Sequence, residues 1–597
     1  MSTSLLSDPR FVGAVHELAE RQERPGDAVM ADAAACLAEM ETSQQRVGRA
    51  IWARWATYLY SRAYRLTVDE EALARIRDLG RTHPLVFLPS HRSNLDGYVM
   101  ASLLYKHGFP GNFTLGGKNM AFWPIGPLGR RSGVIWIRRS FRDDDVYKLT
   151  LRHYLGHLVR QGHDLEWYIE GGRTRTGKLL PPTLGLFTYL ADAVEDHGVQ
   201  GVHVIPTSIV YDELPEVEEM TTESHGAVKP PEGLPWLLRF ARQQRGDYGN
   251  VQVNFGEPID LAEALAANGS DPVDKAARRL ARHKVAIEVC ARINRATPAT
   301  APSLLTLALL GVEDRALTFQ QVQDVLRPVL RYVIARDIPA DDGARRLTTQ
   351  DGVRETLATL VTHGVVDRYD GGTETVFGIG AEQALVAGFY RNISIHWFLD
   401  RAIAELALLH VADEPGDDVV ESAWDEAFRL RDLLKFDFFF ADREQSRADL
   451  TAEIELIEPG WREHGREHLG EIGPAMVRSG ALMAPRILRS FIETHLVVAD
   501  RLQALGEWPT EPGAIADDCL GLGTQYLRQR RITSRDAISL HLFSPAVKLC
   551  ANYGLLDGPE LVRRRREHAA YLHALQRRLG AAGDLAHASI EQALAFS

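Results

Sequence analysis

Cysteine is scarce in this sequence, with four residues among 597, at positions 36, 290, 519 and 550. No two of them are close enough to form a Cys-x-x-Cys motif, so the sequence predicts neither a structural zinc site nor a redox pair. So few cysteines in so long a chain are typical of a protein from a reducing, cytosolic compartment.

Long apolar runs are also missing, because nowhere do 18 apolar residues follow one another. A membrane-spanning helix is therefore not predicted. The N-terminal segment carries acidic residues at 8, 17, 20 and 23 and lacks a long apolar core, which argues against a signal peptide. If the protein meets a membrane, we expect it to lie on the surface.

An excess of basic residues is absent as well. The chain has 68 Lys and Arg against 80 Asp and Glu, and its net charge of −12 argues against a general nucleic-acid binder. Hydrophobic residues make up 45% and charged residues 25%, a composition typical of folded globular proteins. A length of 597 residues exceeds what one compact core usually supports, so several domains are expected.

Three regions differ in hydrophobic pattern. Residues 1–78 indicate a helical N-terminal region, and residues 301–597 indicate a large, mostly helical C-terminal domain. Between them, residues 79–300 alternate short apolar runs with helical stretches, which predicts an α/β domain with a mixed, largely parallel sheet and flanking helices. Its expected strands are 85–88, 133–137, 164–169, 203–210 and 251–255, and its expected helices lie near 96–107, 145–161 and 184–197. In such sheets, ligands bind beyond the carboxyl ends of the strands.

A winged-helix-like part is expected at about 301–380. Helices near 303–311, 318–335 and 350–363 precede two short strands, 365–369 and 375–379, joined by an Asp-Gly-Gly turn. Nucleic-acid binding would need a basic recognition face, whereas the third helix offers Asp351 and Glu355 against Arg354 alone. We therefore interpret this part as a packing module.

The segment 42–68 is basic and aromatic. It contains five arginines and no acidic residue, interleaved with aromatic side chains that include Trp52 and Trp55. Such a helix is typical of a membrane interface, but a core-facing helix with a basic solvated side would have the same pattern. A second basic and aromatic segment, 235–245 around Trp236, is the other candidate for docking on a membrane.

The first candidate for catalysis is the sequence PSHRSNLD at 89–96, directly after the first strand of the α/β region. His91 would lie on the loop leaving the sheet, and Asp96 would enter the next helix. A carboxylate bonded to one imidazole nitrogen fixes the tautomer and leaves the other nitrogen as a general base, which suits proton removal from an alcohol that attacks an acyl carbon. Ser93 lacks the Gly-x-Ser-x-Gly elbow of a nucleophile, so we expect it to bond the backbone or cap the helix.

A second candidate is the strand 133–137, which has two arginines on each side, at 130, 131, 138 and 139. Arginine matches phosphate with planar, bidentate donors. Because side chains alternate along a strand, at most one of Arg138 and Arg139 is expected to face a ligand.

The third candidate is EGGRTRTGK at 170–178. Its glycines permit close backbone approach to an anion, and Arg173, Arg175 and Lys178 would supply positive charge. Leu179 stands where a P-loop has the hydroxyl residue that holds magnesium, so ATP is not implied.

Four blocks of the sequence resemble those of the glycerophospholipid acyltransferases, and they occur in the same order. They are HRSNLD at 91–96, the strand 133–139, EGGRTRTGK at 170–178 and IPTSIVY at 205–211. The third block, the Arg-Arg pair and the following Leu-Leu-Pro-Pro are similar to the bacterial and mitochondrial glycerol-3-phosphate 1-acyltransferases. FYRN at 389–392 and FDFFF at 436–440 also resemble that branch. One departure is Trp136, where the branch usually has phenylalanine, and it bears on the width of the pocket.

The resemblance implies that residues 79–300 form an acyltransferase domain. Such a domain would transfer a long acyl chain from acyl-CoA or acyl carrier protein to the sn-1 hydroxyl of glycerol 3-phosphate. His91 and Asp96 are the implied catalytic pair. The implied substrate-binding positions are Arg139, Glu170, Gly171 and Arg173, with Trp136 and Pro206 lining the pocket. No metal or prosthetic group is implied.

The expected partners are the two substrates and a membrane surface, at the cytoplasmic face of the inner membrane, and no nucleic acid. Two alternatives stay open. One is an acyltransferase of the same fold that uses dihydroxyacetone phosphate or lysophosphatidate as acceptor. The other is a non-catalytic scaffold that binds through the winged-helix-like part, and the intact His91 and Asp96 argue against it.

Overall fold

The computed structural model describes residues 2–224, 233–244, 246–312, 315–461, 463, 466–480 and 482–595. The chain forms two compact units. Unit 1 comprises Met1–Arg173, Leu179–Pro215 and Lys229–Thr297, and unit 2 comprises Thr174–Lys178, Glu216–Val228 and Pro298–Ser597. The short segment Thr174–Lys178 thus belongs to a different unit from the residues on both sides of it.

Unit 1 is built around an eight-stranded sheet with the order β1-β7-β6-β2-β5-β3-β4, in which β8 also pairs with β6. Strands β4, β3, β5, β2 and β6 run parallel, whereas β7 and β8 pair antiparallel with β6. The predicted mixed, largely parallel sheet is therefore confirmed. The strands are β1 (Arg65–Val68), β2 (Leu85–Pro89), β3 (Asn112–Gly117), β4 (Val134–Ile137), β5 (Asp164–Glu166), β6 (His203–Tyr211), β7 (Asn250–Phe255) and β8 (Ile259–Asp260).

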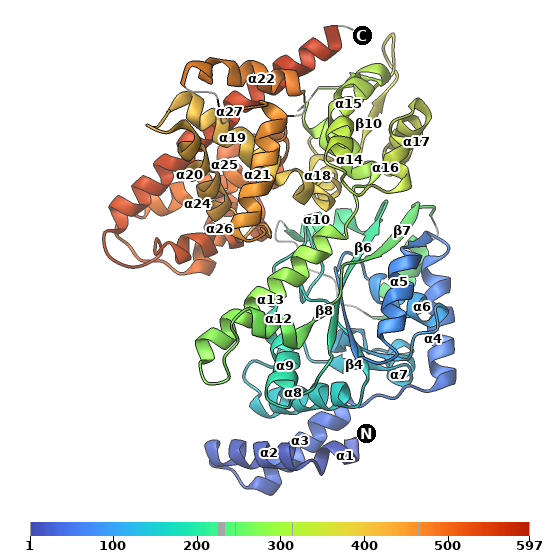
Figure 1. The fold of residues 1–597 in the computed structure, drawn as a ribbon. Helices are drawn as coiled ribbons and strands as arrows, with labels where there is room; N and C mark the ends of the chain where they lie inside the picture. The colour runs from blue at the N-terminus through green and yellow to red at the C-terminus, as the bar shows by residue number, and fades with distance from the viewer. Residues whose placement is uncertain are drawn as a thin grey trace. The chain divides into compact units, whose positions relative to one another are not determined.

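Helices cover both faces of this sheet, with α4, α5 and α6 on one face and α9, α12 and α13 on the other (Figure 1). This arrangement explains why β2, in the middle of the sheet, is buried along its whole length and has no alternation of polar residues. The helices of unit 1 are α1 (Ser2–Leu6), α2 (Pro9–Arg21), α3 (Gly26–Met40), α4 (Arg46–Tyr60), α5 (Glu70–Leu79), α6 (Asp96–Lys106), η1 (Lys118–Met120), α7 (Ile125–Arg131), α8 (Asp145–Arg160), α9 (Leu184–Glu195), α11 (Leu234–Gln243), α12 (Leu261–Ala267) and α13 (Lys275–Arg295).

The domain boundaries differ from the expected ones mainly at the N-terminal region. Residues 1–78 are not a separate helical region, because they cluster with the rest of unit 1 and supply β1, which pairs with β7. Strand β1 lies at the edge of the sheet and none of its residues is fully buried, so its hydrophobic pattern is weak. Strand β3 was also not predicted, since Asn112, Thr114 and two glycines interrupt its apolar residues.

Pro206 lies inside β6, where a missing backbone N–H would ordinarily break a ladder. Along one side of β6, residues 203–204 pair with β8 and residues 207–211 pair with β7. Pro206 lies between these two paired stretches. The Pro206 carbonyl still accepts a hydrogen bond from Gly256 N at 2.8 Å. A proline is therefore accommodated in the middle of the sheet.

Helix α4 packs its tryptophans inward. Trp52 is buried, Trp55 is partly buried, and both rings contact the ring of Tyr98 on α6, at centroid distances of 5.5 and 5.3 Å. Of the two interpretations of this segment, a membrane-interface helix and a core-facing helix, both tryptophans therefore follow the core-facing one. Among the described residues, no helix has the length and apolar character needed to cross a bilayer.

The outer side of α4 exposes a different set of residues. Val47, Ile51 and Tyr58 are exposed apolar or aromatic side chains, and the arginines at 46, 54 and 62 are exposed beside them. Arg49, in contrast, is partly buried and donates to the Phe109 carbonyl at 3.2 Å. In α11, Trp236 is likewise buried and stacks on Phe240, while Arg245 of this candidate segment lies outside the described residues.

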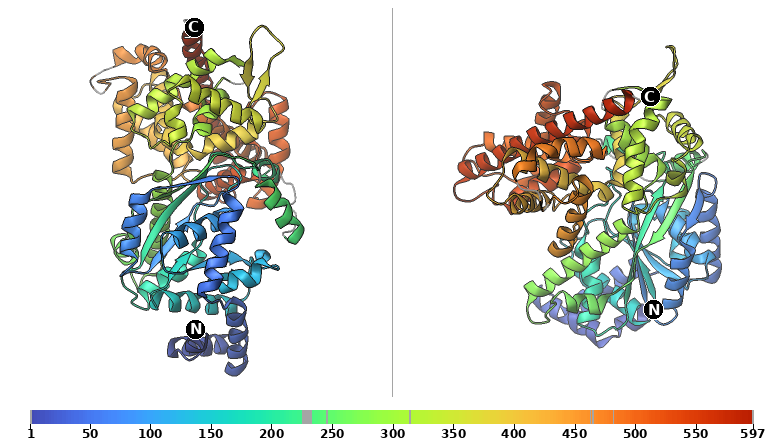
Figure 2. Two further views of the ribbon diagram at one scale, coloured as in Figure 1. Left: turned by 90° about the vertical axis from the view of Figure 1, so that its right-hand side faces the viewer. Right: turned by 45° about the horizontal axis from the view of Figure 1, so that its top comes forward.

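Unit 2 is mostly helical, and the long helix α27 runs across its other helices (Figure 2). Its elements are α10 (Val217–Ser224), α14 (Ala301–Leu310), β9 (Leu317–Thr318), α15 (Phe319–Ala335), α16 (Asp342–Arg346), α17 (Gln350–Thr362), β10 (Asp367–Tyr369), β11 (Val376–Gly378), α18 (Ala384–Ile393), η2 (Ile395–Phe398), α19 (Leu399–Asp413), α20 (Val419–Leu433), α21 (Arg443–Ile457), η3 (Arg466–Glu471), α22 (Ile472–Ser479), α23 (Ala484–Ile487), α24 (Arg489–Ala504), α25 (Pro512–Arg528), η4 (Arg535–Ala537), α26 (Leu540–Asn552) and α27 (Leu561–Ala595).

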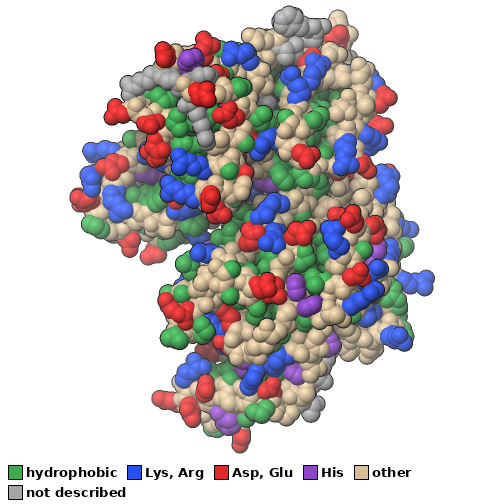
Figure 3. All heavy atoms as spheres, viewed as in Figure 1, with side chains coloured by type: hydrophobic (Ala, Val, Ile, Leu, Met, Phe, Trp, Pro, Cys, Tyr) green, Lys and Arg blue, Asp and Glu red, His purple; other side chains and the backbone are tan. Residues whose placement is uncertain are grey.

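The winged-helix-like part is present in unit 2. Helices α14, α15 and α17 are followed by the β10–β11 hairpin, which projects from this part and pairs with the short strand β9 (Figure 2). Arginines of α16, α17 and β10 are paired with carboxylates: Arg345 with Asp342, Arg346 with Glu355, Arg354 with Asp351, and Arg368 with Asp370. On the face drawn in Figure 3, acidic and basic side chains are interspersed rather than separated.

Two carboxyl groups are buried side by side in the sheet of unit 1. Asp164 and Glu166, on the same side of β5, accept hydrogen bonds from Leu85 N and from the Asn112 side chain, respectively. The second carboxyl oxygen of each has no hydrogen-bond partner in the structure. Burial raises the pKa of Asp164 to about 7 and that of Glu166 to about 8.

These raised pKa values predict a stability that falls with pH. Between the ordinary glutamate pKa and about pH 8, the folded chain holds a proton on Glu166 that the unfolded chain has released. The free energy of unfolding should therefore decrease as pH rises, by at most about 1.4 kcal/mol per pH unit for this group. Glu166→Gln cannot ionise, so in urea denaturation it should lose less stability than the wild type between about pH 6 and 8.

The exposed Glu263 offers a matched control, because Glu263→Gln should keep the wild-type slope. Identical slopes for the wild type and Glu166→Gln would contradict a proton on Glu166 in the folded state.

Candidate active site

The candidate site lies where the parallel strands of unit 1 end. His91 follows β2, Arg139 follows β4, Glu170 follows β5 and Tyr211 ends β6. Because these four strands are parallel, their carboxyl ends lie together along the same end of the sheet, called here its carboxyl edge. The topology therefore brings together blocks that are separated by up to about 120 residues in the sequence.

His91 and Asp96 form the pair that the sequence predicts. The imidazole Nδ1 donates to Asp96 Oδ2 at 2.9 Å, which makes Nε2 the nitrogen that can accept a proton. The Asp96 side chain is fully buried, whereas that of His91 is 19% exposed. The imidazole is therefore accessible to solvent while its carboxylate partner is shielded.

The Asp96 carboxylate accepts three further hydrogen bonds. Its Oδ2 also accepts from Arg92 N at 2.8 Å and Ser93 N at 2.9 Å, and its Oδ1 accepts from the Tyr211 hydroxyl at 2.7 Å. Such donors compensate for the removal of a buried carboxylate from water. The loop 91–95 is thus wrapped around the side chain that begins α6.

Ser93 takes the local role that the sequence predicts. Its side chain is 1% exposed, and its hydroxyl accepts from Leu95 N at 3.1 Å at the start of α6. The structure therefore uses this hydroxyl to bond the backbone.

Tyr168 stacks on the imidazole of His91. The ring centroids are 3.9 Å apart and the planes differ by 15°. Sequence reasoning missed this contact and also gave Tyr211 no role. The position of Tyr211 at the end of the fourth block, 205–211, could have indicated that it lies near His91. Nothing in the sequence indicates that Tyr168 contacts His91.

Glu170 links two of the loops at this edge. Its Oε1 accepts from His91 N at 2.6 Å and its Oε2 accepts from Leu180 N at 2.8 Å. Burial raises its pKa to about 7, against the opposing effects of these two backbone donors and the nearby Arg92 guanidinium. The expected role of Glu170 in substrate binding stays a prediction, but both of its oxygens already hold the backbone.

Gly171 adopts a backbone conformation that favours glycine, with φ +71°. A Cβ atom at this position would also lie 2.8 Å from the side chain of Thr183. The neighbouring Arg173 is largely buried. Substrate binding at Gly171 and Arg173 stays a prediction.

The two arginines after β4 have different surroundings. Arg138 is held by Glu39 at 2.6 Å and Asp144 at 2.8 Å, and it lies over the ring of Tyr147. Arg139 is exposed at the edge of the sheet. The two side chains therefore differ in exposure, and substrate binding at Arg139 stays a prediction.

Trp136 is buried in packing rather than exposed at the edge. Its ring lies against Gly116 and Gly129, where a Cβ atom would come within 2.8 Å of the indole, and its Nε1 donates to the Gly126 carbonyl at 3.2 Å. Pro206 is similarly buried within β6. These contacts assign both residues to the packing of the sheet, and the expected lining of a pocket stays a prediction.

The segment Thr174–Lys178 is held by residues of unit 2. Asn392 Nδ2 donates to the Thr176 carbonyl at 2.8 Å, and Lys178 Nζ donates to the Asp437 carbonyl and lies over the ring of Phe438. A Cβ atom on Gly177 would overlap the Phe389 carbonyl oxygen. The segments 389–392 and 436–440 that carried the sequence resemblance are therefore those that pack against this loop.

This packing corrects one expectation. Arg175 and Lys178 were expected to supply positive charge for an anion, but Arg175 pairs with Glu223 at 2.9 Å and Lys178 is buried. The sequence could not distinguish charges used inside unit 2 from a charge available to a ligand.

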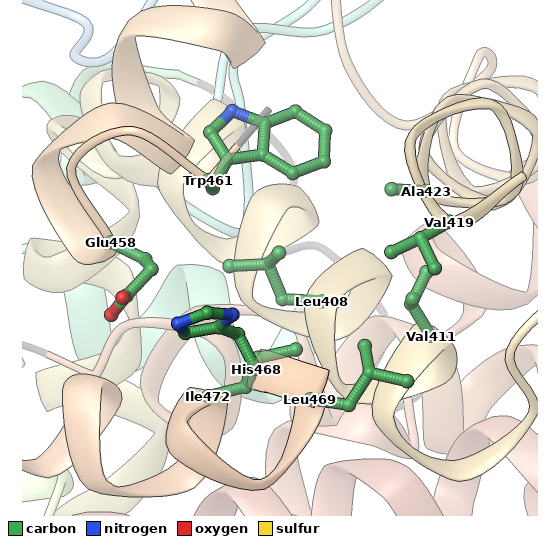
Figure 4. A pocket seen from close by; sticks show the side chains of 9 residues that line it. All are labelled: Leu408, Val411, Val419, Ala423, Glu458, Trp461, His468, Leu469 and Ile472. Atoms are coloured by element: carbon green, nitrogen blue, oxygen red, sulfur yellow. The ribbon is translucent and has the colours of Figure 1, made fainter. Parts of the chain in front are cut away.

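Unit 2 has a cavity of its own, of about 20 Å³. The apolar side chains of Leu408, Val411, Val419 and Ala423 face it together with Trp461 (Figure 4). This volume holds about one water molecule, so the cavity as it stands is too small for a substrate. In the part of the chain that the structure describes, no three His, Cys, Asp or Glu side chains form a group that could hold a metal ion.

Comparison with known proteins identifies two family matches. Residues 67–210 match the acyltransferase family, and residues 220–558 match the C-terminal region of glycerol-3-phosphate acyltransferases. The chain is 40% identical over 589 residues to proteins of Mycobacterium tuberculosis and Mycobacterium bovis, each named "Putative acyltransferase plsB1", covering 98% of this chain and 94% of theirs.

Among solved structures, the 1-acyl-sn-glycerophosphate (LPA) acyltransferase PlsC of Thermotoga maritima aligns with 41% of this chain and 80% of its own. Its sequence identity is 16% and its TM-score is 0.24.

The geometry predicts that acyl transfer depends on the imidazole and not on the serine hydroxyl. His91→Ala should lower kcat by roughly 10²- to 10⁴-fold, the usual contribution of a general base, with an unchanged circular dichroism spectrum. Ser93→Ala is the matched control and should keep most of the activity without accumulating an acyl-enzyme. A His91→Ala protein with near-normal kcat would contradict the role of the imidazole.

Proposed function

The chain belongs to the glycerol-3-phosphate acyltransferase family, and we propose that it transfers a long acyl chain to the sn-1 hydroxyl of glycerol 3-phosphate. The acyl donor would be a thioester of coenzyme A or of acyl carrier protein, and the product 1-acyl-sn-glycerol 3-phosphate. The observation that carries this proposal is the 2.9 Å bond from His91 Nδ1 to Asp96 Oδ2 at the carboxyl edge of the sheet.

In the proposed mechanism, His91 Nε2 removes the proton from the acceptor hydroxyl as the oxygen attacks the thioester carbonyl. Asp96 stabilises the imidazolium that forms. The tetrahedral intermediate then collapses, the C–S bond breaks, and the imidazolium returns its proton to the departing thiolate. The acyl group passes directly from sulfur to oxygen, and Ser93, whose hydroxyl bonds the backbone, takes no part.

The phosphate of the acceptor would be bound by Arg139 and Arg173. The exposure of Arg139 beyond β4 supports its role, whereas the neighbouring Arg138 is held by Glu39 and Asp144. Arg173 lies three residues after Glu170, whose backbone contacts tie this loop to His91. Gly171 would allow close approach of the acceptor to the backbone.

An assay of free thiol release tests the function directly. With palmitoyl-CoA as donor, release should depend on glycerol 3-phosphate, and the lipid product should carry the acyl group at sn-1. Dihydroxyacetone phosphate and lysophosphatidate serve as competing acceptors. Preference for either of them would overturn the assignment of the acceptor while leaving an acyltransferase.

Arginine substitutions should separate acceptor binding from donor binding. Arg139→Ala and Arg173→Ala should each raise the KM for glycerol 3-phosphate by about 10-fold or more and leave the KM for acyl-CoA nearly unchanged, since a charge-assisted contact to phosphate is lost. Lysine should restore binding only in part, because it lacks the bidentate fork. Arg138→Ala is the neighbouring control. Equal increases in both KM values would place these arginines at the phosphates of the donor instead.

We also propose that the protein acts on the surface of a membrane, at the cytoplasmic face of the inner membrane. The long-chain product partitions into bilayers, which supports docking near the site of synthesis. Helix α4 offers exposed Val47, Ile51 and Tyr58 beside the exposed arginines at 46, 54 and 62. No acidic residue lies between positions 42 and 68, so this helix is complementary to anionic lipid.

Reversing three charges tests this surface. Each arginine near an anionic bilayer contributes about 1 kcal/mol, so Arg46→Glu/Arg54→Glu/Arg62→Glu should release the protein from phosphatidylglycerol vesicles in co-sedimentation. The same change at Arg75 and Arg77 of α5 and at Arg81, just after this helix, alters the net charge equally and should keep binding. Unchanged pelleting of the α4 variant would exclude α4 and direct attention to α11.

A further inference from the structure

Two tyrosines contact the His91–Asp96 pair from separate strands of the sheet. Tyr211, at the end of β6, donates to Asp96 Oδ1 at 2.7 Å. Tyr168, beyond the end of β5, stacks on the imidazole at 3.9 Å. Neither residue belongs to the loop that carries the pair, and the mechanism above uses neither of them.

We propose that Tyr211 and Tyr168 are positioning residues for the base: Tyr211 sets the proton affinity of His91 through Asp96, and Tyr168 holds the plane of the imidazole. The proposal rests on the proposed function insofar as His91 acts as the base. It does not depend on which acceptor or donor the enzyme uses.

Tyr211 affects how the negative charge of Asp96 is shared between its two carboxyl oxygens. Three of the four donors to this carboxylate come from the loop itself, and two of them are backbone N–H groups that a side-chain substitution leaves in place. The fourth is the Tyr211 hydroxyl, which draws negative charge toward Oδ1 and away from His91. Without it, the carboxylate interacts more strongly with the imidazolium, and the proton affinity of His91 rises.

Other ionisable groups surround the pair and stay the same in such a variant. The charge of Asp96 acts on Arg92 from the loop, Glu166 of β5, Glu170 after β5, and the phenol of Tyr168. Burial, together with Asp96, keeps the pKa of Tyr211 well above its usual value, so the phenol remains a donor over the working pH range. A shift after loss of the Tyr211 hydroxyl can therefore be attributed to that one donor.

Tyr168 contacts His91 through its ring rather than through its hydroxyl. The hydroxyl oxygen is buried and has no hydrogen-bond partner in the structure. The aromatic face, in contrast, covers one face of the imidazole nearly in parallel. The stacked ring restricts rotation of the imidazole out of this plane. Phenylalanine at position 168 should therefore keep the function of the tyrosine ring, whereas leucine should not.

The first experiment measures the pH dependence of kcat/KM for Tyr211→Phe. Loss of one hydrogen bond to the carboxylate should move the acidic limb upward by about 0.5 to 1 pH unit, with activity largely recovered above the shifted limb. Tyr64→Phe is the matched control, because Tyr64 packs edge-on against the Tyr211 ring and bonds the Glu213 carbonyl instead of Asp96. A limb that stays in place for Tyr211→Phe, with activity reduced equally at every pH, would overturn the role of Tyr211.

The second experiment compares Tyr168→Phe with Tyr168→Leu. Phenylalanine should keep kcat within about 2-fold of the wild type, and leucine should lower kcat about 10-fold or more while leaving the KM for the acceptor nearly unchanged. Equal activities of the two variants would overturn the role of the ring, and so would a loss in Tyr168→Leu confined to KM.

A direct titration separates these outcomes from the identity of the substrates. In protein labelled with [¹³C]histidine, the His91 signal is assigned by its absence in His91→Ala, and its titration is followed without any substrate. The midpoint should be higher in Tyr211→Phe than in the wild type and Tyr64→Phe. If glycerol 3-phosphate fails as acceptor but this shift is seen, the proposed function fails and the inference stands. An unshifted midpoint overturns the inference for Tyr211 whatever the acceptor.

Discussion

The buried carboxylate of Asp96 is the interaction on which the rest of the candidate site depends. A charge with no exposed surface is stable only if hydrogen-bond donors replace the water that it has lost. Here the donors are His91 Nδ1, two backbone N–H groups of the same loop, and the Tyr211 hydroxyl. Because Asp96 is also the first residue of α6, its negative charge lies at the positive end of a helix. Satisfying this one group holds the loop, sets the tautomer of His91 and ties the start of α6 to the end of β6.

Glu170 repeats the same principle one strand away. Its two oxygens accept from backbone N–H groups of His91 and Leu180, so one buried side chain ties the loop after β2 to the loop after β5. Both carboxylates therefore act on the backbone before any substrate is present. Such preorganisation is what proton transfer and acyl attack require, since reacting groups must be held within a fraction of an ångström of their working positions. In the same part of the unit, Glu39 and Asp144 hold Arg138, whereas Arg139 is exposed.

Unit 2 holds the second part of the sequence motif at 170–178. Its residues Asn392 and Asp437 bond Thr176 and Lys178, and its Phe389 carbonyl leaves room for no side chain at Gly177. The motif 170–178 is therefore one block in sequence but two parts in structure, with its first four residues in unit 1 and the rest in unit 2. This division gives a physical reason for the shared occurrence of that block with FYRN and FDFFF, more than 200 residues farther along the chain.

The sequence by itself determined the α/β class, the largely parallel sheet, the winged-helix-like part and the meeting of His91 with Asp96. Hydrophobic periodicity is a local property, so it predicts helices and strands. His91 and Asp96 lie five residues apart across the start of a helix, and they can meet without contacts from the remainder of the fold. Tertiary structure alone decided which polar groups are satisfied by the protein itself. It turned Trp52 and Trp55 toward α6, paired Arg175 with Glu223, and brought Tyr168 and Tyr211 to the His91–Asp96 pair. Such contacts join segments that are distant in the chain, and those of Tyr168 and Tyr211 depend on the strand order, which is set by long-range pairing that no local pattern encodes.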